Sequence, residues 1–449
     1  MAKLPFSRKV YYGMAGFTMN VPDLIFMQWI LVRYVSPDGD HLAPAKVFGA
    51  IVLCARLIEG VSCTLIAHYS DVCRHPSGRR LPFMRYGILP FALVFFLVFM
   101  PPIGHLSWIN AAYAAVLIPL YFILYGIIIT PYLALIPEIT ANLKERVDLT
   151  TSQSVFMMVG TFTFAAIGIA LDKLDWVVTM GGVAVLVTLF FVPAATRIRE
   201  KPQQLAPDHE DLGYFQSFWL TLKNRPFRYV LASTAIYWFG LNGIIALVPH
   251  WTKSYLGGTE GDVTLLMLPF LLMNVVFFFV FNALSAKFGK YVLMLVTFLA
   301  SGLVIGMLYI VGHVPLGSPF LQSAVVMSLF GIPVAGFMVL PFAVLGDVVD
   351  YDERLTGRRR EAIFFGVQGI FQKLMIGVSV FTFTTVAYLG ADGTDAAPTE
   401  FGMKLMALLC AASAVIAFLV FLRYPIRERD GKIVLTDGLP SSAPPPSRE

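Results

Sequence analysis

Twelve long apolar runs fill most of the chain, and they restrict its possible folds more than any other feature. A helix needs roughly 20 apolar residues to cross about 30 Å of hydrocarbon. Because a backbone inside lipid must satisfy its amides within its own segment, these runs predict helices. We therefore predict an all-α membrane protein. The predicted spans are residues 9–35, 45–69, 84–102, 108–137, 150–172, 176–194, 227–253, 262–286, 290–312, 320–348, 361–389 and 402–424.

The composition argues against a soluble enzyme. Charged residues make up 14% of the chain and apolar residues 57%, whereas soluble domains carry about 25% charged residues. The formal charge of +5 is spread over short breaks between the apolar runs. We therefore expect contact with membrane lipid and no nucleic-acid partner.

Basic residues in the breaks predict the orientation. Of the 33 lysines and arginines, 26 fall on the side that holds both termini, five on the other side and two inside spans. Lysine and arginine are enriched in cytoplasmic loops. This bias predicts that both termini and the long middle loop are cytoplasmic, in the inner (plasma) membrane of the cell.

A polar middle loop at 195–226 separates six spans from six. Pro131 to Glu138 in the first half resembles Pro341 to Asp347 in the second, about 210 residues later. A repeat at half-chain distance predicts two similar bundles with a site near mid-membrane. We predict an N-terminal six-helix bundle (1–194), a linker (195–226), a C-terminal six-helix bundle (227–424) and a disordered tail (425–449).

Ionisable residues inside spans indicate candidate functional sites, because burying a charged group in lipid is costly. Arg56, Glu59 and Cys63 share one face of the second predicted span, with Ser62 beside them. Lys373 lies in the eleventh span. These five residues are our candidate coupling site. The alternatives are a fixed structural pair for Arg56 with Glu59, and a contact between helices for Lys373.

Asp23 lies mid-depth in the first span, behind Asn20 and Pro22. It is a candidate for substrate binding, and the alternative is a cap for the turn at Pro22. Other polar and aromatic side chains in spans form a pool from which substrate contacts are drawn. The full set of candidate substrate residues is Asn20, Asp23, Tyr125, Ser154, Trp238, Asn242, Gln368 and Gln372.

Charges at the cytoplasmic ends of spans form a second class. Acidic residues at the C-terminal end of a helix oppose the helix dipole and therefore need another partner. We predict a gate that pairs across the halves when this side is closed, and the alternative is solvated loop charge. The candidate gate residues are Asp71, Arg79, Arg80, Asp347, Asp350, Asp352 and Arg358.

Motifs for other chemistry are missing from the sequence. It holds no Gly-rich phosphate loop, no metal-ligand spacing and no Ser/His/Asp order that suggests hydrolysis. We predict no catalytic residues, no metal site and no cofactor beyond a coupling ion, H⁺ or Na⁺.

The chain resembles the glycoside–pentoside–hexuronide:cation symporters of the major facilitator superfamily, the group of the melibiose permease. The resemblance covers nearly the whole chain. It is carried by Tyr12-Gly13 with Gly16-Phe17, Arg56 to Asp71, Gly78-Arg79-Arg80, Pro131-Tyr132, Pro137-Glu138, Asp347 to Glu361 and Phe364 to Gly369 with Lys373.

This resemblance implies two six-helix bundles, alternating access and sugar uptake driven by a cation. The family's cation site has two acids one turn apart, which correspond to Glu59 and Cys63, and a lysine that corresponds to Lys373. Since a thiol is a poor ligand for sodium, the change at Cys63 favours a proton. The family's sugar-binding positions also differ here, at Asn20, Ile129, Leu133 and Ser154.

We therefore expect cation-coupled symport of a small organic solute such as a sugar or glycoside, with a proton favoured over sodium. The alternatives are an uncoupled facilitator, a translocator of lysolipids or other amphipaths, and a non-transporting receptor or scaffold. We expect a monomer with a small-molecule substrate.

Overall fold

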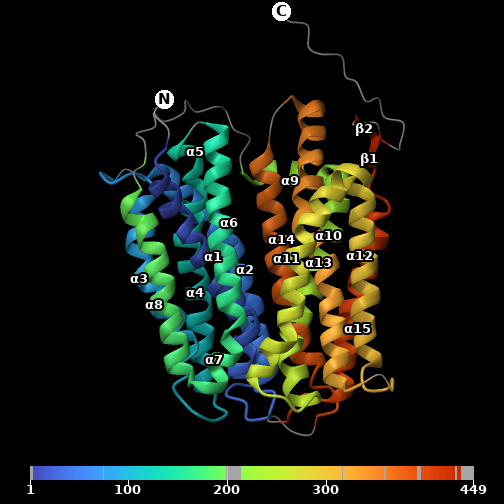
Figure 1. Cartoon of the computed structure of the whole chain (residues 1–449). Coiled ribbons are helices and arrows are strands. Elements are labelled where there is room, and N and C mark those ends of the chain that lie inside the picture. Colours follow the sequence, from blue (N-terminus) through green and yellow to red (C-terminus); the bar gives the residue numbers. More distant parts are fainter. Residues whose placement is uncertain are drawn as a thin grey trace, which may run out of the picture. The chain divides into compact units, whose positions relative to one another are not determined.

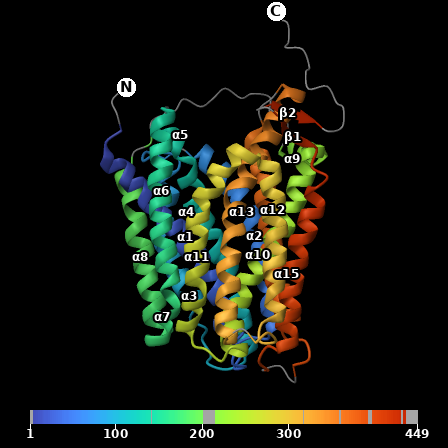
Figure 2. The same cartoon turned by 45° about the vertical axis from the view of Figure 1, so that its right-hand side comes forward.

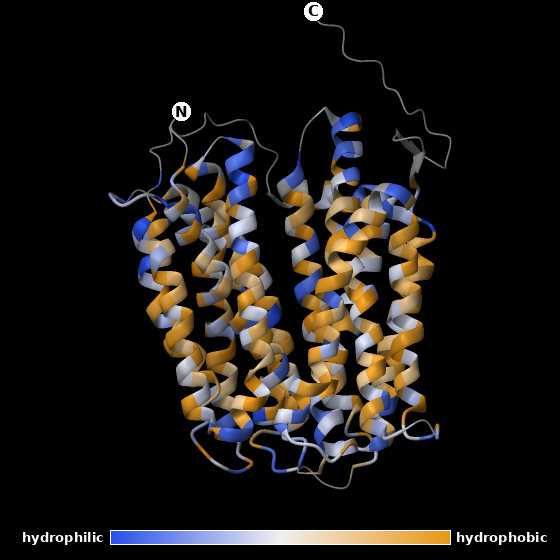
Figure 3. Ribbon diagram, viewed as in Figure 1, coloured by the Kyte–Doolittle hydropathy of each residue, from blue (hydrophilic) through white to orange (hydrophobic). Residues whose placement is uncertain are grey.

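The computed structural model describes residues 4–73, 75–140, 142–198, 200, 214–315, 317–357, 360–391, 396–429 and 432–435. Twelve helices in this part of the chain are long and apolar enough to cross a membrane. Apolar residues occupy the middle of the helices and polar residues gather at their ends (Figure 3). All twelve predicted spans are present, with ends that differ from the predictions by up to eight residues.

The molecule consists of two compact units, which are described separately. The first contains Met1–Pro207, Ile245–Thr264 and Val380–Met403, and the second contains Asp208–Ile244, Leu265–Ser379 and Lys404–Glu449. The boundary therefore passes through four helices near one of their ends. The predicted division into bundles of residues 1–194 and 227–424 stays a prediction.

Eight helices in the described residues lie wholly within the first unit. They are α1 (Phe6–Tyr34), α2 (Ala45–Val72), α3 (Leu81–Val98), α4 (Trp108–Ala134), α5 (Ile136–Ile139), α6 (Leu143–Ala165), α7 (Ile167–Lys173) and α8 (Trp176–Arg197). Helix α1 packs against α6 and α8, and α4 packs against α2 and α3 (Figures 1 and 2). We call the end where α1 begins the near face of this unit, and the end where α1 finishes the far face.

Two glycines let α1 approach α6 closely. A Cβ atom added at Gly13 would lie 2.1 Å from the Ser152 hydroxyl oxygen, and one added at Gly16 would lie 2.4 Å from the Gln153 carbonyl oxygen. No side chain fits at those distances. Contact between helices in a membrane depends on small residues of this kind.

The remaining elements belong wholly or mainly to the second unit. They are α9 (Tyr214–Lys223), α10 (Arg225–His250), α11 (Glu260–Phe288), α12 (Lys290–Gly306), the 3₁₀ turn η2 (Met307–Ile310), α13 (Pro319–Thr356), α14 (Glu361–Val386) and α15 (Glu400–Phe421). A π-helical turn, η1 (Trp251–Tyr255), continues α10 into the first unit. Helix α12 packs against α13.

Two local features differ from the sequence-based expectation. The linker contains a helix, α9, within 195–226. The tail, predicted to be disordered from residue 425, contains an antiparallel pair of strands, β1 (Ile426–Arg429) and β2 (Lys432–Leu435). Residues 436–449 lie outside the described part.

Candidate functional site

Arg56 links α2 to α1 inside the first unit. Its Nη1 atom donates to the Glu59 carboxylate over 2.7 Å, and its Nη2 atom donates to the Asp23 carboxylate over 3.0 Å. Arg56 and Glu59 are three residues apart and therefore lie on one face of the helix. Asp23 reaches the same guanidinium from the turn that follows Pro22 in α1. We call these three residues the Arg56 cluster.

Aromatic rings enclose the guanidinium of this cluster. Its carbon lies 4.2 Å from the centroid of the Phe122 ring and 5.9 Å from that of Phe26, within the range of cation–π attraction. The buried Arg56 Nε atom has no hydrogen-bond partner among the described residues. The positive charge is therefore held by two carboxylates and two rings.

The two carboxylates differ in burial. The side chain of Glu59 is 3% exposed and that of Arg56 is 2% exposed, whereas that of Asp23 is 40% exposed. Glu59 therefore forms a sealed pair with Arg56. Asp23 holds the same guanidinium from a position open to exchange with its surroundings.

Ser62 and Cys63 lie beside the cluster on α2. The Ser62 hydroxyl donates to the backbone carbonyl of Glu59 over 3.1 Å, so it serves its own helix. The Cys63 thiol faces α4, because a Cβ atom at Gly126 would lie 3.3 Å from its sulfur. Their predicted part in coupling stays a prediction.

The predicted substrate residues of the first unit make contacts between and within helices. Asn20 donates to the Met157 carbonyl over 2.9 Å and to the Thr161 hydroxyl over 2.8 Å, which ties α1 to α6. The Tyr125 hydroxyl donates to the Met19 carbonyl over 2.5 Å, and the Ser154 hydroxyl donates within α6 to Thr150. Asp23 joins the Arg56 cluster, so the structure groups it with the predicted coupling residues.

The second unit holds the other predicted intramembrane residues. Lys373 and Gln372 are half-buried on α14, and the buried Gln368 Oε1 atom has no partner among the described residues. A Cβ atom at Gly366 or Gly369 would meet nothing within 4 Å, which leaves room along this helix.

On α10, Asn242 donates to the Trp238 carbonyl over 2.9 Å, and the Trp238 ring lies edge-on to that of Phe337. Asn242 therefore bonds within its own helix, while the Trp238 ring reaches α13. The predicted substrate roles of Trp238, Asn242, Gln368 and Gln372, and the coupling role of Lys373, stay predictions.

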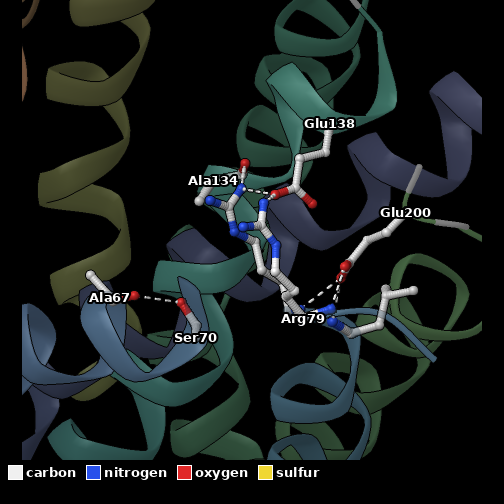
Figure 4. A network of polar contacts seen from close by, with 8 residues as sticks. Ala67, Ser70, Arg79, Ala134, Glu138 and Glu200 are labelled. Carbon is white, nitrogen blue, oxygen red and sulfur yellow. Dashed lines mark hydrogen bonds and ion pairs between the residues drawn. The ribbon is translucent and has the colours of Figure 1, made fainter. Parts of the chain in front are cut away.

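Figure 4 shows a charged network at the near face of the first unit. The Glu138 carboxylate lies 2.7 Å from Arg79 and 3.0 Å from Arg80, and it is only 3% exposed. The Glu200 carboxylate accepts hydrogen bonds from the backbone amides of Arg79, Arg80 and Leu81, at the start of α3. A carboxylate is favoured there because a helix N-terminus has unpaired backbone amides and is the positive end of the helix dipole.

Equivalent pairs occur in the second unit. Asp352 forms an ion pair of 2.7 Å with Arg360 and accepts from Asn224, while Asp347 pairs with Lys290 at 2.6 Å. Asp350 is exposed. These contacts lie within one unit, and the predicted pairing of gate residues across the halves stays a prediction. Arg358 and the side chain of Asp71 lie outside the described part of the structure.

A set of contacts that the sequence did not predict lies at the far face of the first unit. His250 Nε2 lies 2.9 Å from the Val35 carbonyl oxygen, and the Ser254 hydroxyl donates to the Pro37 carbonyl over 2.6 Å. Lys253 forms ion pairs with Asp38 at 2.7 Å and with Glu260 at 2.6 Å. These contacts fix the end of α10 and η1 to the segment after α1, and we call them the far-face clasp.

One aromatic contact accompanies the clasp. The ring of His41 lies edge-on to that of Tyr388, with 5.3 Å between centroids. Burial raises the pKa of the Tyr388 phenol, so this group stays protonated at physiological pH. The signal for the clasp in the sequence was slight, since Lys253 and His250 are single polar residues at the end of an apolar run.

Comparison with known proteins covers almost the whole chain. The family model described as "MFS/sugar transport protein" matches residues 11–428. The isoprimeverose transporter of Lactiplantibacillus pentosus is 22% identical, over 84% of this chain and 78% of that protein. The putative sulfoquinovose importer of Escherichia coli K12 is also 22% identical, over 97% of this chain and 94% of that protein.

A solved structure shares the fold. The crystal structure of a D-xylose-proton symporter superposes with a TM-score of 0.69, over 96% of this chain and 99% of that chain. Its sequence identity is 14%, so this likeness shows the fold alone.

Proposed function

The chain belongs to the MFS/sugar transport protein family, and from that membership we propose that it carries a sugar or glycoside across the membrane together with one proton. The expected family and the all-α major facilitator fold are confirmed by the family model and by the structural relative. The chain is accordingly a membrane transporter and not an enzyme. The substrate, the coupling ion and the orientation are the parts that we propose.

The charge of the Arg56 cluster is the observation that carries the coupling proposal. Two carboxylates share one guanidinium, so the three groups have a formal charge of −1 when all are ionised. A net charge on a group of side chains in a region of low dielectric constant is unfavourable. One added proton brings the cluster to neutrality, which supports one proton for each transport cycle.

Burial assigns different roles to the two acids. Glu59 is sealed against Arg56, and its loss would leave a buried guanidinium with half of its compensation. Asp23 has an exposed carboxylate on the same guanidinium, so a proton can reach it without opening the pair. We assign proton exchange to Asp23 and charge fixation to Glu59. Protonation of Asp23 weakens its bond to Arg56 and so frees α1 to shift against α2.

A proton fits the cluster better than sodium does. Sodium prefers several oxygen ligands, and the position one turn after Glu59 holds the thiol of Cys63. Within the described residues no three His, Cys, Asp or Glu side chains come together in a metal-binding arrangement.

For the solute, we propose a neutral sugar or glycoside, or a sugar that carries one acidic group. Two relatives are described as an isoprimeverose transporter and a putative sulfoquinovose importer, which supports a sugar as substrate. We further propose a monomer in the plasma membrane. The bias of basic residues supports a cytoplasmic near face.

Uptake into proteoliposomes tests the proposal. Isoprimeverose, sulfoquinovose and D-xylose are supplied outside, with an imposed pH gradient, an imposed sodium gradient or neither. We expect accumulation above the outside concentration with the pH gradient alone. Accumulation with the sodium gradient alone would replace the proton by sodium. Equilibration without accumulation under either gradient would make the chain a facilitator.

A further inference from the structure

A cavity of about 300 Å³ opens at the far face of the first unit. Its wall includes Arg33, Ser36, Asp40, Trp176, Lys253 and Glu260, all of which belong to that unit. This volume is at the lower end of the roughly 300–1,000 Å³ that small-molecule sites occupy. We call it the far-face pocket, and it is separate from the Arg56 cluster.

Arg33 is held in one orientation in the wall of this pocket. Its Nε atom donates to the Phe99 carbonyl over 3.0 Å, and its guanidinium lies 5.3 Å from the centroid of the Trp176 ring. No carboxylate of the described residues lies within ion-pair distance of it. The terminal amino groups of Arg33 are therefore available as fixed donors to a ligand.

Acceptors line the same pocket. Lys253 already pairs with Asp38 and Glu260. Asp40 is exposed and makes no hydrogen bond or ion pair with any residue that the structure describes. The pocket thus presents a donor, Arg33, and an acceptor, Asp40, that do not bond to each other.

The balance of charge selects the ligand. Arg33 and Lys253 face three carboxylates, Asp38, Asp40 and Glu260, for a formal charge of −1 in the wall. This negative charge disfavours an anionic ligand. A neutral polyol suits the site because each hydroxyl both donates and accepts, and so satisfies the guanidinium and the carboxylate without adding charge.

From this arrangement we infer that the far-face pocket binds a neutral polyhydroxylated solute, at a second site for the sugar of the proposed function. The identity of that solute rests on the proposed function, while the pocket's preference for neutral polyols does not. The far-face clasp forms part of the wall through Lys253, Asp38 and Glu260. A solute bound there contacts both segments that the clasp joins.

Protection of a new cysteine tests the inference. Ser36 is replaced by cysteine in the full-length protein, and labelling by a membrane-impermeant maleimide is measured in right-side-out and inside-out vesicles. The unmodified chain gives the background from its native cysteines. We expect labelling from the far face, and methyl β-D-glucopyranoside should slow it about tenfold at roughly ten times its dissociation constant.

Variants of the wall separate binding from folding. Arg33→Ala or Asp40→Asn in the S36C chain should raise the concentration for half-protection about tenfold or more. Lys46→Ala removes an exposed cation that does not line the pocket, and it should leave protection unchanged. Glucuronate, an anion of similar size, should protect less well than the neutral glycoside.

Several results would overturn the inference: no labelling of S36C, no protection by the glycoside, equal protection in R33A, or better protection by glucuronate. Uptake is measured on the same vesicles. Protection without uptake would refute the proposed transport and leave the pocket in place. Uptake without protection would refute the pocket and leave the transport proposal in place.

Discussion

The Asp23 carboxylate on α1 lies 3.0 Å from the Arg56 guanidinium on α2, although the two residues are 33 positions apart in the chain. This bond brings the first two helices together at a single positive charge. The buried Glu59 carboxylate on α2 accepts a hydrogen bond from the same guanidinium. Exchange of one proton at Asp23 therefore changes the bond between two helices as well as the charge of one side chain.

Substituting the two acids should have different effects. Asp23→Asn removes the exchangeable carboxylate and should abolish accumulation under a pH gradient. Because the Asp23 side chain is 40% exposed, we expect Asp23→Asn to lower stability less than Glu59→Gln does. Glu59→Gln removes a buried partner, and we expect a loss of about 3–5 kcal/mol. Uptake and thermal unfolding of both variants measure the two effects.

Asp148 provides a matched control for Asp23. Its side chain is 38% exposed and forms an ion pair with Lys9 on α1, at the near face. Asp148→Asn should leave both accumulation and unfolding temperature close to those of the parent protein. If D23N still concentrates the sugar, proton exchange does not occur at Asp23.

Close packing of α1 on α6 gives a second prediction. Gly16→Ala places a Cβ atom 2.4 Å from the Gln153 carbonyl oxygen, so the helices must separate. We expect destabilisation of about 1–3 kcal/mol, as in other overpacked cores, seen as a lower unfolding temperature in detergent. Gly182→Ala on α8 has nothing within 4 Å of the added atom and should not lower that temperature. Equal unfolding temperatures for the two variants would contradict the prediction.

The near-face network predicts a stability effect that depends on burial. Glu138→Gln leaves Arg79 and Arg80 without their shared carboxylate, and Glu138 is 3% exposed. We expect a loss of about 3 kcal/mol or more. Asp347→Asn breaks a pair in the second unit whose side chains are 27% and 14% exposed, so its loss should be smaller. Chemical or thermal unfolding of both variants gives the order, and the reverse order would refute the role of burial.

The far-face clasp predicts a change in local opening. Lys253→Met leaves Asp38 and Glu260 close together without their shared cation. We expect amide hydrogen exchange in residues 35–43 to become faster by about tenfold, because the segment opens at lower free energy. Lys46→Met is the control, since it removes an exposed lysine outside the clasp. Unchanged exchange in K253M would show that the remaining contacts hold this segment by themselves.

The fold could be predicted from the sequence because hydropathy and length act locally. All twelve spans follow from apolar runs, and Arg56 with Glu59 follows from helical spacing. The sequence predicts a substrate role for Asp23 and not its bond to Arg56, because one sequence does not show how α1 is rotated against α2.

Contacts between distant segments could not be predicted from the sequence for the same reason. His250 meets the carbonyl of Val35, 215 residues away, through a backbone atom that every residue carries. In the sequence Lys253 is one of the five basic residues predicted on the side opposite the termini, and nothing marks Asp38 as its partner. In the sequence Glu138 belongs to a repeat, and its pairing with Arg79 and Arg80 depends on the path of the loop before α3.

The π-helical turn at Trp251–Tyr255 has a consequence for how this region can be altered. Its bond from the Leu256 amide to the Trp251 carbonyl spans five residues, one more than an α-helical bond does. The turn thus accommodates one surplus residue while the chain on both sides keeps its direction. Removing a single residue from it should restore α-helical pairing and rotate Lys253 relative to Glu260. Length, as well as side-chain identity, therefore decides which partners this lysine meets.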